Sequence, residues 1–242
     1  MRALWCGCCC LYLMLAFALG GICTAPRSVA SPGPTVLPGM EIRQGTSSCT
    51  VGFVEPQLRV ALTTGRCGDG SVVSDADGTV LGSVVVAHHN ATATGTPGEG
   101  SILSVEYEVI ELAPGVAAAD LLPNGNRLES SPGLEAQEGM PVCHFGKSTG
   151  QTCGHVASTG NGRFTIPDMT VDKSTAGEPV YVLTDDNRVM IVGLLDDTGT
   201  PVPQAESWQA IMKQLYVDTH GASPQAPLPV VRIAGAHQVL AG

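Results

Sequence analysis

Aromatic and charged side chains are scarce in this chain of 242 residues: aromatics make up 4% and charged residues 14%. Lysine and arginine together number 12 against 22 acidic residues, giving a formal net charge of −10. No basic stripe or patch is visible, which argues against a nucleic-acid partner. An apolar content of 43% with so few charges excludes a disordered chain and suits a β protein. Thirty glycines and 17 prolines indicate many turns, and the length allows one large all-β domain or two small ones.

The N-terminus has the features of an export leader. A positive start at Arg2 precedes an apolar run over residues 4–22, and Ser28-Val29-Ala30 before Ser31 fits a cleavage site. We therefore expect residues 1–30 to be a signal peptide and the mature protein to be secreted. Two alternatives stay open: a retained membrane anchor, since about 20 apolar residues can span a bilayer, and a lipoprotein, for which the context of Cys23 is poor.

Cysteine use agrees with export. Nine cysteines are present, five in the leader and four beyond it: Cys49, Cys67, Cys143 and Cys153. An even set of four in an exported chain predicts two disulfides, for which three pairings are possible. A zinc site built from these four is disfavoured because no two of them form a Cys-x-x-Cys pair. We expect no metal and no cofactor.

Alternating apolar residues mark strands in both halves of the chain. Residues 49–54, 58–63 and 79–86 alternate, and an Asp-Gly turn at Gly78 predicts a hairpin. Residues 113–137 are rich in proline and glycine and read as a linker. Apolar residues at helical spacing over 206–216 predict a C-terminal helix, and the chain ends in a Pro- and Ala-rich segment expected to be a mobile tail.

Three local motifs carry a resemblance to a known family. Thr63-Thr64-Gly65-Arg66-Cys67-Gly68 resembles Thr-Ala-Gly-His-Cys-Gly, and Glu106-Tyr107 opens a strand that resembles one beginning Asp-aromatic. The third motif, residues 174–180, reads Ser-Thr-Ala-Gly-Glu-Pro-Val where the family has Gly-Asp-Ser-Gly-Gly-Pro-Val. The chain thus resembles the chymotrypsin/trypsin-like serine proteases of the bacterial secreted branch, over about residues 40–217.

The resemblance implies an all-β fold of two six-stranded antiparallel β-barrels with a C-terminal helix. It places the N-terminal barrel at residues 40–112, the linker at 113–137, the C-terminal barrel and helix at 138–217, and the tail at 218–242. It also implies the disulfides Cys49–Cys67 and Cys143–Cys153. Asp196 follows a segment that resembles the strand beside the substrate pocket, where an acid would favour a cationic group, although we expect a solvated turn at this position.

At the triad positions the resemblance puts Arg66 for the general base, Glu106 for the orienting acid and Ala176 for the nucleophile. Alanine has no oxygen, and a guanidinium stays protonated and cannot act as a base. The oxyanion-hole positions are Ser174 and Ala176, where serine replaces a glycine. We expect Arg66 and Glu106 to form an ion pair where a His–Asp pair stands in the family.

These substitutions predict a secreted, monomeric protease homologue that has lost catalysis and binds a protein or peptide ligand. Two alternatives remain: a peptidase or esterase that uses Ser174 or Thr175, and an envelope-anchored structural protein, which would meet a membrane only through a retained leader. No histidine lies in a triad motif. His144 and His155 flank the second cysteine loop, where structural roles are expected rather than metal binding.

Overall fold

The computed structural model describes residues 33–89, 105–172, 176–196 and 201–221. The predicted signal peptide, Ser174, Thr175 and most of the predicted tail lie outside these ranges. Within the described residues no helix is long and apolar enough to cross a membrane.

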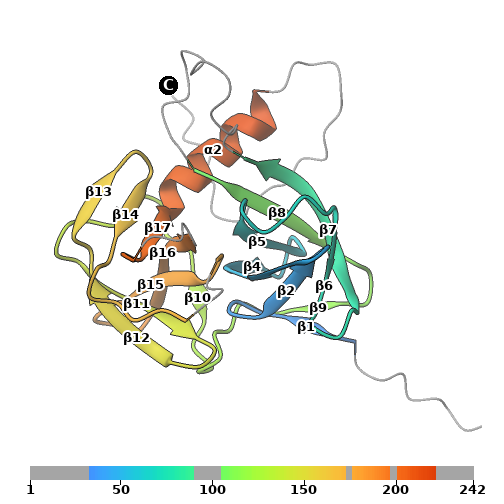
Figure 1. Ribbon diagram of the computed structural model, residues 1–242, viewed down its shortest axis with the longest axis horizontal. Coiled ribbons are helices and arrows are strands. Elements are labelled where there is room, and N and C mark those ends of the chain that lie inside the picture. Colours follow the sequence, from blue (N-terminus) through green and yellow to red (C-terminus); the bar gives the residue numbers. More distant parts are fainter. Residues whose placement is uncertain (1–32, 90–104, 173–175, 197–200, 222–242) are drawn as a thin grey trace, which may run out of the picture. The chain divides into compact units, whose positions relative to one another are not determined.

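Two antiparallel sheets make up the fold, one from each half of the chain (Figure 1). The first sheet has the order β3-β2-β6-β7-β8-β5-β4. Its strands are β2 (Glu41–Gln44), β3 (Ser47–Thr50), β4 (Phe53–Glu55), β5 (Val60–Thr64), β6 (Val72–Ser74), β7 (Val80–His88) and β8 (Tyr107–Leu112).

The second sheet has the order β12-β11-β15-β16-β17-β14-β13, with β10 paired to β16. Its strands are β10 (Leu128–Glu129), β11 (Pro141–Gly146), β12 (Gly150–His155), β13 (Ser158–Gly160), β14 (Arg163–Thr165), β15 (Pro179–Leu183), β16 (Val189–Asp196) and β17 (Gln204–Ser207). A separate parallel pair joins β1 (Thr35–Val36) to β9 (Ala117–Ala118).

The predicted all-β class with two antiparallel β-barrels and a C-terminal helix is confirmed, although the sheets contain seven and eight strands rather than six each. Short segments account for the difference: β10 adds two residues parallel to β16, and β13 extends the far edge beyond β14.

The helix α2 (Trp208–His220) follows β17 directly and runs three residues past the predicted boundary at residue 217. Trp208 anchors it: this side chain is fully buried, its ring centroid lies 4.8 Å from that of Phe53, and its Nε1 donates to Ser130 Oγ at 2.8 Å. Phe53 belongs to β4 of the first sheet, so one apolar cluster joins α2 to both sheets. Burying a Trp–Phe contact of this kind fixes the sheets against each other.

One of the two predicted disulfides is present. Cys143 and Cys153 lie opposite each other on β11 and β12 and are bonded, with an S–S distance of 2.03 Å. The predicted Cys49–Cys67 disulfide is absent, and both residues are buried free thiols. The hydrogen bond with the Cys49 thiol, followed by burial, raises the pKa of the Cys67 thiol. A raised pKa disfavours the Cys67 thiolate, the form through which a thiol is oxidised.

Candidate functional site

Arg66 and Glu106 emerge at the same end of two paired strands. Strands β5 and β8 are antiparallel with Thr64 opposite Tyr107, so the residue positions just after β5 and just before β8 are neighbours. Gly65 makes the turn possible, because a Cβ there would lie 2.7 Å from His88 O and 2.8 Å from Tyr107 N. The local sequence thus brings the two side chains together.

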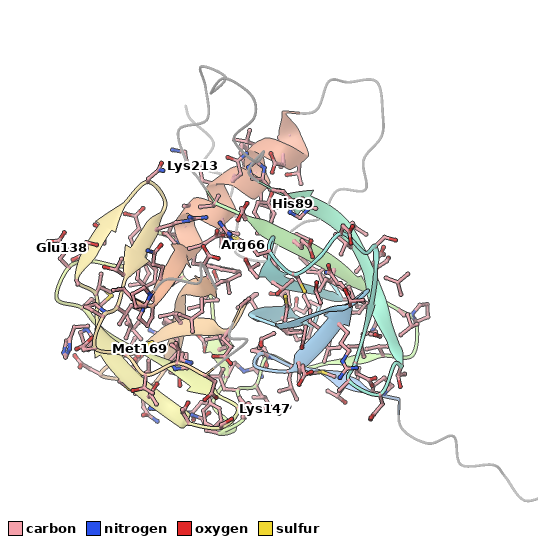
Figure 2. The ribbon with its side chains drawn as sticks, in the orientation of Figure 1. Arg66, His89, Glu138, Lys147, Met169 and Lys213 are labelled. Carbon is pink, nitrogen blue, oxygen red and sulfur yellow. A yellow bond between two sulfur atoms is a disulfide. The ribbon has the colours of Figure 1, made fainter. Side chains whose placement is uncertain are left out.

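The predicted ion pair is present. Arg66 Nε lies 2.7 Å from Glu106 Oε2 and 2.9 Å from Asp196 Oδ1. Asp196 ends β16 of the second sheet, so this guanidinium bridges the two halves of the fold, and Figure 2 shows Arg66 where they meet. Its side chain keeps 40% of its surface exposed, whereas the carboxylates of Glu106 and Asp196 are buried.

A second arginine completes the arrangement. Arg163 Nη2, from β14, lies 3.0 Å from Glu206 Oε1 and 3.5 Å from Asp196 Oδ2. Glu206, on β17, also accepts the backbone N–H of Glu106 at 2.7 Å. We call the five side chains Arg66, Glu106, Arg163, Asp196 and Glu206 the ionic cluster.

The charge of the cluster depends on Glu206. Burial, supported by the neighbouring Asp196 carboxylate, raises the pKa of Glu206 to about 8. A protonated Glu206 at neutral pH leaves two arginines against two carboxylates, so the buried charges balance.

Asp196 lies neither in a solvated turn nor in an open pocket, the two positions that its sequence context allowed. Its side chain is fully buried, and Arg66 and Arg163 both contact its carboxylate. The Asp196 carboxylate is therefore already paired with two arginines and is not available to a cationic ligand. Asp196 lies at the end of β16, where the two sheets meet. A charge buried there is stable only when it is paired with an opposite charge.

Ala176 lies in a turn that is tied to the first sheet. Its carbonyl accepts the N–H of Thr50 at 2.9 Å, and Gly177 N donates to Leu195 O at 2.8 Å. Gly177 has φ 91°, and a Cβ there would lie 2.3 Å from Thr50 O. The side chain at position 176 is a buried methyl group. The second predicted oxyanion-hole residue, Ser174, is outside the described residues, as is Thr175.

A buried acid–base pair that sequence reasoning missed includes Glu178, which lies just after this turn. His144 Nδ1, on β11, is 2.8 Å from Glu178 Oε2, and His144 Nε2 is 2.8 Å from Thr170 O. A carbonyl only accepts, so Nε2 carries a hydrogen; Nδ1 and Glu178 then share one further proton. Burial raises the pKa of Glu178. The available signal was the acid at Glu178, where the resembled motif has glycine.

The remaining histidine prediction concerns His155. His144 is paired across the hairpin with Thr152, and His155 with Pro141, so the two histidines do not face each other. His155 Nδ1 instead lies 3.0 Å from Asp168 Oδ2 on the surface. Among the described residues, no group of three or more His, Cys, Asp or Glu side chains is arranged to hold a metal ion.

The sequence of this chain is similar to that of a known protein. The chain is 38% identical over 203 residues to a Mycobacterium tuberculosis protein named "Uncharacterized protein Rv1815", covering 84% of this chain and 91% of that protein. The chain belongs to the Rv1815 family. No protein-family model matches it.

This member of the Rv1815 family has a chymotrypsin-like fold. Thermobifida fusca protease A superposes with a TM-score of 0.54 at 17% identity, over 75% of this chain and 96% of the protease. A glutamic-acid-specific serine protease superposes with a TM-score of 0.53 at 18% identity, over 75% and 97%. The resemblance read from the three motifs is therefore confirmed for the fold: this chain has the architecture of the chymotrypsin/trypsin-like serine proteases.

Proposed function

We propose that this chain is a secreted homologue of trypsin-like serine proteases that does not hydrolyse peptides and acts as a binding protein for a peptide or protein ligand. The observation that supports it most is the ionic cluster. At the positions matched to base and orienting acid, Arg66 and Glu106 form a 2.7 Å ion pair.

The chemistry of acyl transfer needs a nucleophile, a base that takes its proton, and donors for the oxyanion. Arg66 forms ion pairs with two carboxylates, and its guanidinium has no lone pair available to accept a proton. Ala176 has no side-chain oxygen, and its methyl group is buried in an apolar cluster. Loss of the nucleophile alone reduces turnover on the order of a millionfold in this mechanism class, so turnover is expected to be negligible.

Binding remains available to such a scaffold because function resides in the site rather than the fold. Arg66 is 40% exposed and keeps guanidinium surface open to solvent where a substrate would meet a protease. The paired carboxylates hold it in one orientation, which lowers the entropy lost when a ligand contacts it. The leader and the Cys143–Cys153 bridge support action outside the cell, where we propose that the protein acts as a monomer.

Back-substitution tests whether the triad positions are assigned correctly. The triple variant Arg66→His, Glu106→Asp, Ala176→Ser and the unaltered protein are assayed with casein and a small ester. Activity in the triple variant alone is the expected result and shows a disabled protease scaffold. Activity in the unaltered protein overturns the proposal and points to Ser174 or Thr175.

A peptide array tests the binding role directly. The mature protein, starting near Ser31, is incubated with arrayed peptides of defined sequence, and bound peptides are then weighed by mass spectrometry. Saturable binding of uncleaved peptides, weakened by Arg66→Ala and unaffected by Arg43→Ala, is expected. Arg43 is a matched control because it is an exposed arginine with only a 3.9 Å contact to Glu41. Absence of any saturable binding contradicts the proposal.

A further inference from the structure

A cavity of about 250 Å³ opens beside the ionic cluster. Its wall includes Arg163 and Phe164 from β14, Ala210 and Lys213 from α2, and Glu135 from the segment before β11. Figure 2 shows Lys213 on α2, apart from Arg66. Arg163 belongs both to this wall and to the ionic cluster, so the cavity and the cluster share one guanidinium.

Arg163 has hydrogen-bonding capacity left over. Its contacts to Glu106, Asp196 and Glu206 all use the single nitrogen Nη2. Its Nε is buried and has no hydrogen-bond partner among the described residues. An unsatisfied buried donor is unfavourable, so an acceptor that reaches this guanidinium is favoured.

The other charges in the wall have a smaller influence. Lys213 and Glu135 are less enclosed than Arg163, so water and salt screen them, whereas the Arg163 side chain is only 21% exposed. Among the lining residues, a cationic ligand would face Arg163 and Lys213 with Glu135 as the one acid, and the cluster carboxyl groups behind Arg163 are already paired with arginines. An apolar ligand would leave the buried donor unsatisfied. A carboxylate matches the planar guanidinium of Arg163 and is also attracted by Lys213.

The size of the cavity limits the ligand. Pockets for drug-sized molecules occupy roughly 300–1,000 Å³, and this one is smaller. It fits one side chain rather than a cofactor, and Phe164 and Ala210 suit the methylene groups that carry a carboxylate. We propose that this carboxylate pocket binds an aspartate or glutamate side chain of the ligand, which rests on the proposed binding function and names the chemistry that the ligand presents.

The shared guanidinium couples this pocket to the cluster. A bound carboxylate adds a negative charge next to Arg163 and therefore favours the protonated form of Glu206. Burial raises the pKa of Glu206 to about 8, so Glu206 is protonated below that pH and charged above it. Binding is expected to weaken as the pH rises from 7 to 9, because the ionised Glu206 competes for Arg163.

The test uses three pentapeptides, acetylated and amidated at their ends, with a central Glu, Gln or Lys. Binding to the nitrogen-15-labelled mature protein is followed through the amide signals of residues 158–165 and 207–213. The Glu peptide is expected to shift these signals with saturation, more tightly at pH 7 than at pH 9, and the Gln and Lys peptides to bind at least about tenfold more weakly.

Single substitutions show which residues bind the Glu peptide. Arg163→Gln is expected to weaken binding of the Glu peptide about tenfold or more, and Lys213→Gln about two- to fivefold. Glu135→Gln is expected to tighten it slightly. Lys147→Gln, which removes the same charge from an 80% exposed lysine on another hairpin, is expected to leave it unchanged. Lys213 and Glu135 lie outside the buried cluster, so their variants report even where Arg163→Gln unfolds the protein.

Equal binding of the Glu and Gln peptides, or no shift of these amides by any of the three, overturns the carboxylate pocket. In either case the peptide array still decides the proposed function, because ligand binding elsewhere on the protein survives loss of this pocket. A Glu-selective shift that Lys147→Gln abolishes and Lys213→Gln does not also overturns it, since attraction to overall charge then explains the binding.

Discussion

The ionic cluster and the His144–Glu178 pair both carry charge at positions that depart from the protease motifs, but their surroundings differ. In the cluster, two arginines with permanent charge face three carboxyl groups, and Arg66 reaches solvent. In the pair, both side chains are buried and one proton serves two groups. The cluster can therefore adjust its charge through Glu206, whereas the pair is enclosed away from solvent. This contrast predicts that the pair matters more for folding and the cluster more for function.

Breaking the buried pair should have the largest effect. Glu178→Ala leaves the His144 Nδ1 buried without its partner, and removing one member of a buried pair destabilises by about 3–5 kcal/mol. Glu178→Gln keeps a neutral hydrogen-bond partner and should lose clearly less. Urea unfolding followed by fluorescence of Trp208 measures both, with Glu111→Ala, an exposed acid on β8, as the control expected within about 0.5 kcal/mol. Equal losses for Glu178→Ala and Glu111→Ala would contradict the buried-pair account.

The dependence of stability on pH should distinguish the ionic cluster from the His144–Glu178 pair, because Glu206 titrates within the cluster. Its pKa is about 8 in the folded protein, above the ordinary value of 4.5, so the folded state holds a proton that the unfolded state has released between these values. Stability is therefore highest below about pH 4.5 for this group and falls by a few kcal/mol as the pH rises through 8. Glu206→Gln should flatten that part of the profile of unfolding free energy against pH. A profile unchanged by Glu206→Gln would assign the loss to other groups, such as Glu178.

Removing Arg66 should have the smallest effect on stability. Arg163 still approaches Glu106 and Asp196 at 3.8 and 3.5 Å, and Arg66 is partly solvated, so Arg66→Ala should cost about 1–2 kcal/mol. Arg43→Ala, at an exposed surface position, should cost less than about 0.5 kcal/mol. Thermal unfolding at pH 7 compares the two. A loss for Arg66→Ala larger than that for Glu178→Ala would reverse the ranking of the two sites.

The fold could be predicted from the sequence, and so could the Arg66–Glu106 ion pair, whose residues both lie in the first half of the chain. Arg66 and Glu106 could be paired in advance because both motifs end or begin at strands that the resemblance places side by side. The second disulfide was also predictable, since its cysteines flank one short hairpin.

Contacts between the sheets were beyond sequence reasoning. Asp196, Arg163 and Glu206 come from three different strands of the second sheet, and only its pairing register puts Arg163 opposite Glu206.

The predicted Cys49–Cys67 bond was wrong because adjacency of two thiols does not by itself oxidise them. Glu178 was noticed as a departure, but its partner His144 lies 34 residues away and meets it only through the packing of β11 against β15.

The central claim, that this protease-like site has no nucleophile, is tested most directly with a fluorophosphonate probe. The mature protein and its Arg66→His, Glu106→Asp, Ala176→Ser variant are incubated with the probe and weighed intact. The account predicts that the unaltered protein gains no mass, and an adduct on the serine introduced at position 176 of the variant would show that the probe reaches the site. An adduct on the unaltered protein, mapped to Ser174 or Thr175, would contradict the account and identify an active hydrolase.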